Sequence, residues 1–477
     1  MTLYDNYIRY AKGDMYPFHM PGHKRNTELI RMMNPYMFDS TEITDLDDLH
    51  NPDDKAGWIQ DSEKLAAELF HSRYSFYTVN GSTGALIASV LALSKPHQKV
   101  LVARNCHISI YNAIALAQLD PIYLWPKMDR DGICASIQPE QIQQAFQEHS
   151  DIALVILVSP TYEGVLSDIS GIADIVHRHR ARLLIDEAHG AHLALDHRFP
   201  KSAIETGADV VVQSLHKTLP CLTQTAILHV CSDRMDPNTI RRMIAVEETS
   251  SPSYILVCSC DQCIHLMKDH GRELFDAYWQ RLTGFDQEMK SLQHLHILCH
   301  GSDAKENHPG FYDFDPGKIL ISTKGTSITG PALSKILRET YHLETEYTRM
   351  DAVLAMTSVA DTREGFHRLE KALLEIDAEL KAQEDHQNPI SLPDTITTGT
   401  LSPSQAMEKE AENAEPDKAI GRIAREAVFA YPPGIPILVP GEVITKEQLS
   451  YLKKMQNAGL QVVSASHGFP HHLEVCR

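Results

Sequence analysis

Two aliphatic runs of the chain end in side chains that could do chemistry together. The run LLID ends at Asp186, and the next run, VVVQS, is followed closely by Lys217. Open parallel sheets bind ligands at the carboxyl ends of their strands, so both side chains are expected at one edge. A lysine there can form a Schiff base, and a carboxylate can pair with a pyridinium nitrogen. The pair predicts a site for pyridoxal 5'-phosphate (PLP), with a turn-capping Asp186 and a surface Lys217 as the alternatives.

Two further segments place polar groups beside expected strand ends. The string NGSTG precedes an expected helix, whose first N–H groups and positive dipole end can bind phosphate, with Ser82 and Thr83 adding hydroxyl donors. A plain N-capped turn explains that string equally well. His107 follows the run KVLVA, where an imidazole could stack on a cofactor ring or move a proton. A histidine that only shapes the turn is the alternative.

Composition narrows the class of protein. The 477 residues include 44 Lys plus Arg and 63 Asp plus Glu, for a net charge of −19. That charge argues against nucleic acid and anionic membrane surfaces as partners. No stretch of 18 apolar residues is present, and the N-terminus lacks the pattern of a signal peptide. Nine scattered cysteines do not resemble a disulfide framework, so a cytoplasmic protein with reduced thiols is expected.

One cysteine cluster allows a second type of chemistry. Cys258, Cys260, Cys263 and His265 form the string C-x-C-x-x-C-x-H, which could hold a metal ion. The surrounding residues, ILVCSCDQCIHLM, are mostly apolar, and free cysteines are often simply buried. A packed helix is therefore favoured, and no metal is expected.

The elements that would position these residues follow from alternating patterns. Short aliphatic runs alternate with helical stretches from about residue 60 to about residue 260, which predicts an α/β fold with a mostly parallel sheet covered by helices on both faces. A long helix and a second, smaller alternating block follow. The expected organisation is an arm, a large PLP-binding domain, a connecting helix with a small α/β domain, a polar connector and a C-terminal domain, at 1–55, 56–261, 262–383, 384–418 and 419–477.

Nine strings, in order along the chain, carry a resemblance. They are FHMPGHKRN, ITDLDDLHNP, VNGSTG, ARNCHIS, SPTYEGV, IDEAHGAHL, SLHKTLPCLTQTAILH, TSSPSY and YPPGIPILVPGE. Together they resemble the short form of the Orn/Lys/Arg decarboxylase family. The resemblance implies a fold-type I PLP-dependent enzyme, a homodimer or larger assembly, and α-decarboxylation of arginine, lysine or ornithine to the corresponding polyamine and CO2.

The same resemblance implies a role for each candidate residue. Lys217 would carry PLP, Asp186 would pair with its ring nitrogen, and His107 would stack over the ring and assist proton transfer. The remaining residues would contact the phenolic oxygen (His189), the phosphate (Ser82, Thr83, Ser214 and His216) and the distal cation of the substrate (Glu346). Ile108, where the family often has lysine, and Cys221, where it usually has alanine or serine, depart from the pattern.

Two other functions compete with decarboxylation. Another fold-type I activity, an aminotransferase or a β-eliminating lyase, would yield a keto acid instead of an amine. A catalytically silent relative with a regulatory role is the second rival, because a fold does not imply a function. The presence of Asp186, Lys217 and His107 together argues against the silent relative.

Overall fold

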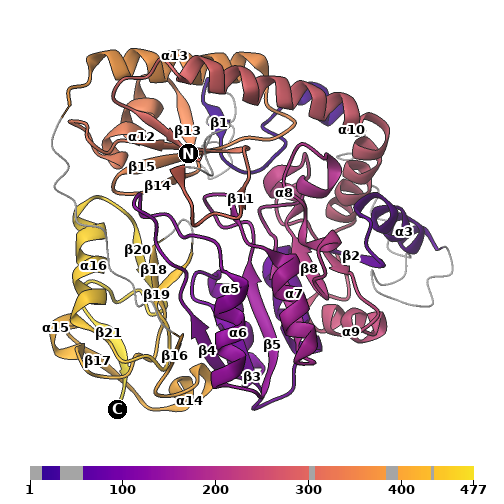
Figure 1. The fold of residues 1–477 in the computed structure, drawn as a ribbon, viewed down its shortest axis with the longest axis vertical. Coiled ribbons are helices and arrows are strands. Elements are labelled where there is room, and N and C mark those ends of the chain that lie inside the picture. Colours follow the sequence, from indigo (N-terminus) through magenta and orange to yellow (C-terminus); the bar gives the residue numbers. More distant parts are fainter. Residues whose placement is uncertain (1–12, 33–56, 300–306, 383–395, 431–433) are drawn as a thin grey trace.

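The computed structural model describes residues 13–32, 57–299, 307–382, 396–430 and 434–477. Within them the chain forms a large domain around an eight-stranded sheet, a small domain around a four-stranded sheet, and a C-terminal domain. In Figure 1 the small domain lies at the top, the large domain below it, and the C-terminal domain at the lower left. No helix of the described segments is both long and apolar enough to cross a membrane.

The large sheet is mostly parallel, as predicted. Its strand order is β16-β4-β3-β5-β7-β8-β9-β2, and the five central strands from β4 to β8 all run parallel. The strands are β2 (Tyr74–Thr78), β3 (Lys99–Ala103), β4 (Asp120–Leu124), β5 (Ile152–Val158), β7 (Arg182–Asp186), β8 (Val210–Gln213), β9 (Ala226–Val230) and β16 (Ile396–Thr398). Only β4 was missed among the parallel strands, because it opens with Asp120 and Pro121, residue types that strands disfavour.

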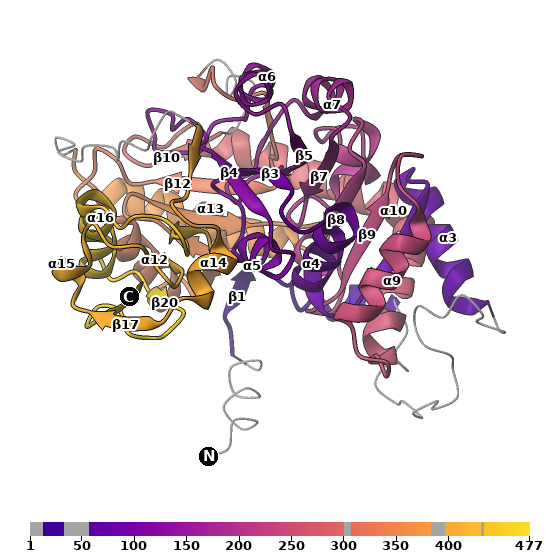
Figure 2. The same cartoon turned by 90° about the horizontal axis from the view of Figure 1, so that it is seen from below.

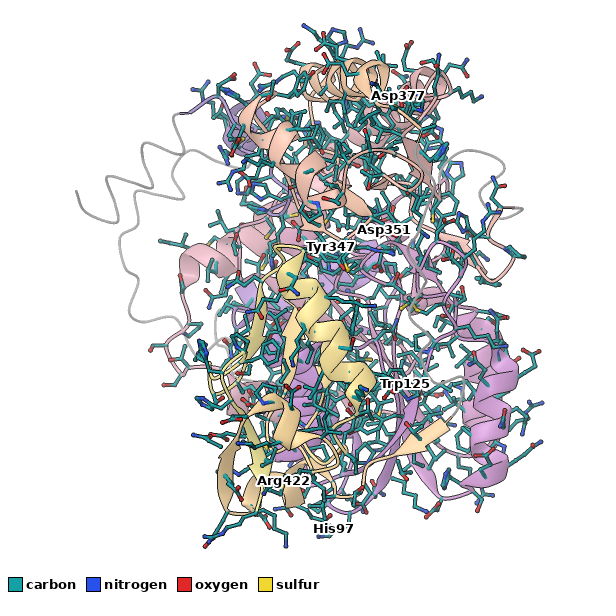
Figure 3. All side chains as sticks on the ribbon, turned by 90° about the vertical axis from the view of Figure 1, so that its left-hand side faces the viewer. His97, Trp125, Tyr347, Asp351, Asp377 and Arg422 are labelled. Carbon is teal, nitrogen blue, oxygen red and sulfur yellow. The ribbon has the colours of Figure 1, made fainter. Side chains whose placement is uncertain are left out.

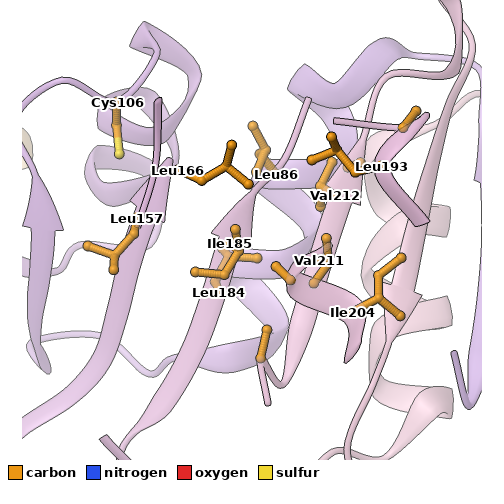
Figure 4. Close-up of a cluster of buried hydrophobic side chains, with 14 of the residues drawn as sticks. Leu86, Cys106, Leu157, Leu166, Leu184, Ile185, Leu193, Ile204, Val211 and Val212 are labelled. Carbon is orange, nitrogen blue, oxygen red and sulfur yellow. The ribbon is translucent and has the colours of Figure 1, made fainter. Parts of the chain in front are cut away.

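Helices cover both faces of this sheet. Figure 2 shows α6 and α7 on one face and α4 and α5 on the other. The helices of the large domain are α3 (Trp58–Phe70), α4 (Gly81–Leu93), α5 (Ile108–Leu116), α6 (Pro139–Glu148), α7 (Ile169–Arg178), α8 (Leu215–Thr218) and α9 (Pro237–Glu247). Because both faces are covered, consecutive strand residues such as Leu184, Ile185, Val211 and Val212 are all fully buried (Figure 4).

The predicted arm joins the small domain. Its strand β1 (Tyr16–Phe18) pairs in parallel with β13 (Leu343–Thr345), and helix α2 (Thr27–Met32) follows. The string ITDLDDLHNP of the arm lies outside the described residues. A two-stranded pair, β6 (Val165–Leu166) with β11 (Asp313–Phe314), links the large and small domains.

The small domain is antiparallel and is reached through one long helix. Helix α10 (Tyr254–Met289) begins before the predicted start at residue 262, so the Cys258–Cys263 segment is its first part. The sheet order is β10-β12-β15-β14, with β10 (His296–Leu298), β12 (Lys318–Ser322), β15 (Ala352–Met356) and β14 (Tyr347–Thr348). Helices α12 (Gly330–Glu339) and α13 (Arg363–Glu379) complete it.

The predicted connector at 384–418 contains regular structure in its described part. Strand β16 pairs with β4 of the large sheet. The indole N–H of Trp125, which is labelled in Figure 3, donates to Thr397 Oγ1 at 2.9 Å. Helices α14 (Pro403–Glu408) and α15 (Pro416–Ala419) and strand β17 (Ala411–Ala414) follow, with β17 paired to β21 (Leu473–Cys476). The segment reads as a linker because its elements are short and its surface is polar.

The rest of the C-terminal domain has its own apolar core. Strands β19 (Pro436–Leu438), β18 (Val428–Ala430) and β20 (Val462–Ser464) form a three-stranded sheet, and helix α16 (Lys446–Asn457) packs on it. Val428, Leu452 and Leu473 are fully buried in that core.

Candidate active site

The structure places Asp186 and Lys217 on the same edge of the large sheet. Asp186 is the last residue of β7, and Lys217 lies on the one-turn helix α8 that follows the neighbouring strand β8. Burial raises the pKa of Asp186, and the nearby Lys217 ammonium opposes that effect. Among the described residues, the hydrogen bond of the Asp186 carboxylate is from the Ala188 N–H, at 3.1 Å. The carboxylate is thus poised for a cationic partner.

His189 lies between two lysines. Its Nε2 is 3.0 Å from Lys217 Nζ, and its Nδ1 is 2.8 Å from Lys318 Nζ. Burial, then the charges of these two lysines, hold the pKa of His189 well below its usual value. The ring also meets the edge of the Tyr162 ring, with centroids 4.5 Å apart. His189 is therefore a neutral imidazole in contact with the Lys217 amine.

His107 begins a helix after β3, which is separated from β7 by β5 in the sheet. It is the N-cap of α5, and its Nδ1 accepts a hydrogen bond from the Ser109 N–H at 3.2 Å. Burial and then the Lys217 charge lower the pKa of His107 to about 4. Because Nδ1 is the acceptor of a neutral ring, the hydrogen is on Nε2.

The four expected phosphate contacts are only partly brought together. Ser214 Oγ donates to Ser82 Oγ at 2.9 Å, so the turns after β8 and β2 meet. Ser82 lies in the first turn of α4, after Gly81 with a φ of +68°, whereas Thr83 next to it is exposed. His216 is buried, and its Nδ1 is 2.7 Å from the Thr225 carbonyl oxygen.

Glu346 reaches the same site from the small domain. Its carboxylate accepts hydrogen bonds from the Tyr162 hydroxyl at 2.5 Å and from the Met20 N–H at 2.9 Å. It is 8% exposed, and its charge raises the pKa values of Lys217 and Lys318, in opposition to burial. One negative charge of the small domain therefore faces the cationic side of the site.

Several residues of the site were not found from the sequence. Lys318 opens an apolar strand, where a lysine looks like an exposed strand end, and Tyr162 stands in a loop without a local signal. The arm contributes Gly22, whose N–H donates to the His216 carbonyl oxygen at 2.6 Å. A Cβ atom at Gly22 would lie 2.5 Å from Leu219 O, so only glycine allows this approach.

The C-terminal domain holds the turn that carries His107. The Arg104 guanidinium forms two hydrogen bonds to the Glu442 carboxylate, at 3.0 and 2.9 Å, and the Ile108 N–H donates to Gly434 O at 3.1 Å. Arg104 is 2% exposed, so the ion pair is shielded from water. His107 is thus flanked on both sides by contacts to the C-terminal domain.

The cysteine cluster does not form a metal site in the described part of the chain. Cys260 and Cys263 belong to the main apolar core, and Cys258 is exposed. The group of potential ligands that the described residues do bring together is Asp129, Asp131 and His308. His308 Nδ1 is already 2.6 Å from Asp129 Oδ2, and Lys324 Nζ is 3.5 Å from Asp131 Oδ1.

The residues present fit PLP. A buried carboxylate suits a protonated ring nitrogen, a lysine amine suits an aldehyde, and two hydroxyls at a helix N-terminus suit a phosphate. Two buried polar atoms beside the candidate residues, Asn105 Oδ1 and Thr218 Oγ1, have no hydrogen-bond partner within the described protein. A polar ligand would satisfy such atoms.

Comparisons with known proteins identify the family of the chain. Residues 1–365 match the family model of the Orn/Lys/Arg decarboxylase major domain, and residues 384–471 match that of the C-terminal domain. Arginine decarboxylase of Bacillus subtilis (strain 168) is 33% identical over 100% of this chain and 97% of its own length. Arginine decarboxylase of Bacillus anthracis is 32% identical over 96% of this chain and 94% of its own.

A solved structure shares the fold. The Francisella novicida lysine decarboxylase LdcF superposes with a TM-score of 0.75 at 19% identity, over 98% of this chain and 79% of that chain. The α/β fold expected from the sequence, fold type I with small and C-terminal domains, is confirmed by this likeness. Matches to both family models across most of the chain show that it belongs to the Orn/Lys/Arg decarboxylase family.

Proposed function

We propose that the protein is a PLP-dependent decarboxylase that converts a basic amino acid to the corresponding amine, with arginine as the first substrate to test. The observation that carries the proposal is the cluster of Asp186, Lys217 and His189 at one sheet edge, with Glu346 facing it. The arginine decarboxylases that align over nearly the whole chain support the choice of arginine.

The protein supplies attachment and charge for this chemistry. PLP, when bound, forms a covalent link to an amine and draws electrons away from the carbon that loses CO2. Lys217 is the amine that would hold the cofactor, and Asp186 would keep the ring nitrogen protonated. When a carboxylate lies close to a cation, the pKa of each group shifts by about 1–3 units in the direction that favours the charged pair.

Proton transfer falls to two side chains. The Lys217 amine would lie where it can return a proton to the carbon that loses CO2. His107 has its hydrogen on Nε2 because Nδ1 is bound to Ser109, so it can also donate there. Stacking over the cofactor ring is the second role that we propose for His107.

Glu346 is proposed to face the distal cation of the substrate. A guanidinium or ammonium group that leaves water must be paired with an acceptor. The Tyr162 hydroxyl and the Met20 N–H hold the Glu346 carboxylate in place through both of its oxygens. Ser82, Thr83, Ser214 and His216 remain the proposed phosphate contacts, with Thr83 the most exposed of the four.

A substrate panel tests the proposal. Purified protein with added PLP should gain an absorbance band near the visible–UV boundary and should release CO2 from one or more of L-arginine, L-lysine and L-ornithine. The products expected are agmatine, cadaverine and putrescine, respectively. CO2 release from none of the three would reject decarboxylation, and a keto acid product would favour an aminotransferase or lyase. Absence of the band would reject PLP binding itself.

Assembly and location stay predictions. We propose a homodimer or larger homo-oligomer on the strength of the family resemblance, and a cytoplasmic location on the strength of the N-terminal pattern and the scattered cysteines. Sedimentation at several protein concentrations tests the first prediction, and cell fractionation tests the second.

A further inference from the structure

Lys318 is a buried lysine that reaches the candidate active site from the small domain. It is the first residue of β12 and is 1% exposed, and its Nζ is 2.8 Å from His189 Nδ1. Its backbone N–H donates to Asp315 O at 3.1 Å. A Cβ atom at Gly164, where φ is +102°, would lie 2.8 Å from Lys318 Cγ. The glycine thus leaves a slot that the lysine stem occupies.

Charged groups around Lys318 leave it mostly protonated at neutral pH. Burial lowers its pKa, the carboxylates of Asp315 and Glu346 raise it, and the ammonium groups of Lys217 and Lys24 lower it, to about 8. The Tyr162 ring also lies 6.0 Å from Nζ. An ammonium group can only donate hydrogen bonds. His189 Nδ1 must therefore be the acceptor in this contact.

These contacts decide which ring nitrogen of His189 carries the hydrogen. A neutral imidazole has one N–H donor and one acceptor nitrogen. Burial and the charge of Lys318 disfavour the cationic ring. With Nδ1 accepting from Lys318, the hydrogen lies on Nε2, which is 3.0 Å from Lys217 Nζ. A protonated Lys217 would put two donors face to face, so its neutral amine fits better.

We propose that Lys318 is a positioning residue, which fixes the Nε2–H tautomer of His189 and thereby keeps Lys217 as a free amine. The inference rests on the proposed function, because the free amine is the form of Lys217 that reacts with the PLP aldehyde. Lys318 acts through His189 and needs no contact with substrate or cofactor.

The test measures the protonation of Lys217 in cofactor-free protein. Lysines are labelled competitively with an amine reagent from neutral to alkaline pH, and peptide mass spectrometry gives the labelling of Lys217. Lys318→Met keeps the length of the side chain but cannot donate. It should move the Lys217 profile up by about one pH unit, which corresponds to roughly tenfold less labelling at neutral pH. An unmoved profile would overturn the inference.

A matched control lies on the same segment. Lys324 follows β12, and its Nζ pairs with Asp131 and Asp351 at 3.5 and 3.7 Å. Lys324→Met should leave the Lys217 profile in place. If thermal unfolding shows that Lys318→Met is not folded, Lys318→Leu replaces it. Lys318→Arg keeps a donor and should restore the wild-type Lys217 profile.

A double variant separates a relay through His189 from a direct charge effect. In a His189→Phe background, Lys318→Met should shift the Lys217 profile much less than it does with His189 present. A shift of equal size would show a direct effect and would overturn the positioning role. Absence of PLP absorbance in the wild type would reject the proposed function alone, because the labelling needs no cofactor. Normal PLP binding and CO2 release with no Lys318 effect would reject this inference alone.

Discussion

Two buried histidines of one short motif, His189 and His192, have opposite surroundings. His189 lies between the amines of Lys217 and Lys318, whereas His192 Nε2 is 3.1 Å from the Asp315 carboxylate. Their exposures are 5% and 2%, so burial does not separate them. The charge of the partner separates them. The two amines keep His189 as a neutral ring that accepts at one nitrogen and donates at the other, whereas the carboxylate requires a donor from His192.

One partner of each histidine comes from the same turn of the small domain, Lys318 for His189 and Asp315 for His192. Asp315 and Lys318 are three residues apart, as are His189 and His192, and the two turns pair crosswise. The Asp315 N–H also donates to Gly164 O at 2.8 Å, which anchors the turn to the large domain. We infer that the His192 contact holds the domains together and that the His189 contact serves the chemistry. The predictions below test that division.

The largest effect is expected on the His189 side, from Lys217→Ala. Loss of the amine that holds the cofactor should abolish the PLP absorbance band and lower CO2 release by at least about 10⁴-fold. Spectra with added PLP and single-substrate kinetics measure both effects. Lys324→Ala is the control, and retention of the band in Lys217→Ala would exclude Lys217 as the attachment point.

Asp186→Asn should lower the activity less than the loss of Lys217 does. The amide keeps the shape of Asp186 but does not stabilise a protonated ring nitrogen, so kcat should fall by about 10²–10³-fold, as a pKa change of 2–3 units implies. PLP should still bind, as absorbance would show. An unchanged kcat would mean that Asp186 does not face the ring nitrogen.

Asp315→Asn tests the structural side. Removal of one partner from the buried His192–Asp315 pair should lower the free energy of unfolding by about 3 kcal/mol at neutral pH, measured by urea unfolding. The pKa of Asp315 is below its ordinary value in the folded protein, so its stabilisation is present above about pH 4 and is lost as the pH falls through the folded value. The difference between variant and wild type should therefore shrink only in acid. If the loss of kcat, expressed as a free energy, exceeded the loss of stability, the His192–Asp315 contact would serve the chemistry instead.

Lys318→Met should have the smallest effect on stability, and of opposite sign. Burial lowers the pKa of Lys318 to about 8, so the folded protein holds a costly charge below that pH. The variant should be more stable by roughly 1–2 kcal/mol at neutral pH, after the lost hydrogen bond to His189 is subtracted. The advantage should fall as pH rises from about 8 to about 10, because folded Lys318 loses its proton before the unfolded chain does. Urea unfolding at both ends of that range checks the sign, and a variant less stable at neutral pH would contradict it.

Local sequence patterns predicted much of the fold and part of the candidate site. Strand-end positions predicted Asp186 and Lys217 at one edge, because a parallel sheet places all its carboxyl ends together. The short elements from Ile396 onward were not predicted, since a short strand such as β16 gains its stability from β4, more than 270 residues away. Glu346 was expected near the substrate only from the family resemblance, and its contact with Tyr162 has no sequence signal.

The sequence by itself determined the parallel sheet, the order of its strand-end residues and the chemistry those residue types allow. Only the tertiary structure decided that Lys318 and Asp315 face His189 and His192, that Gly22 of the arm packs on the lysine turn, and that Glu442 holds the turn of His107. The reason is physical. Hydrophobic periodicity reports which face of a segment is buried, whereas the partner of a buried charge depends on which distant segment packs there.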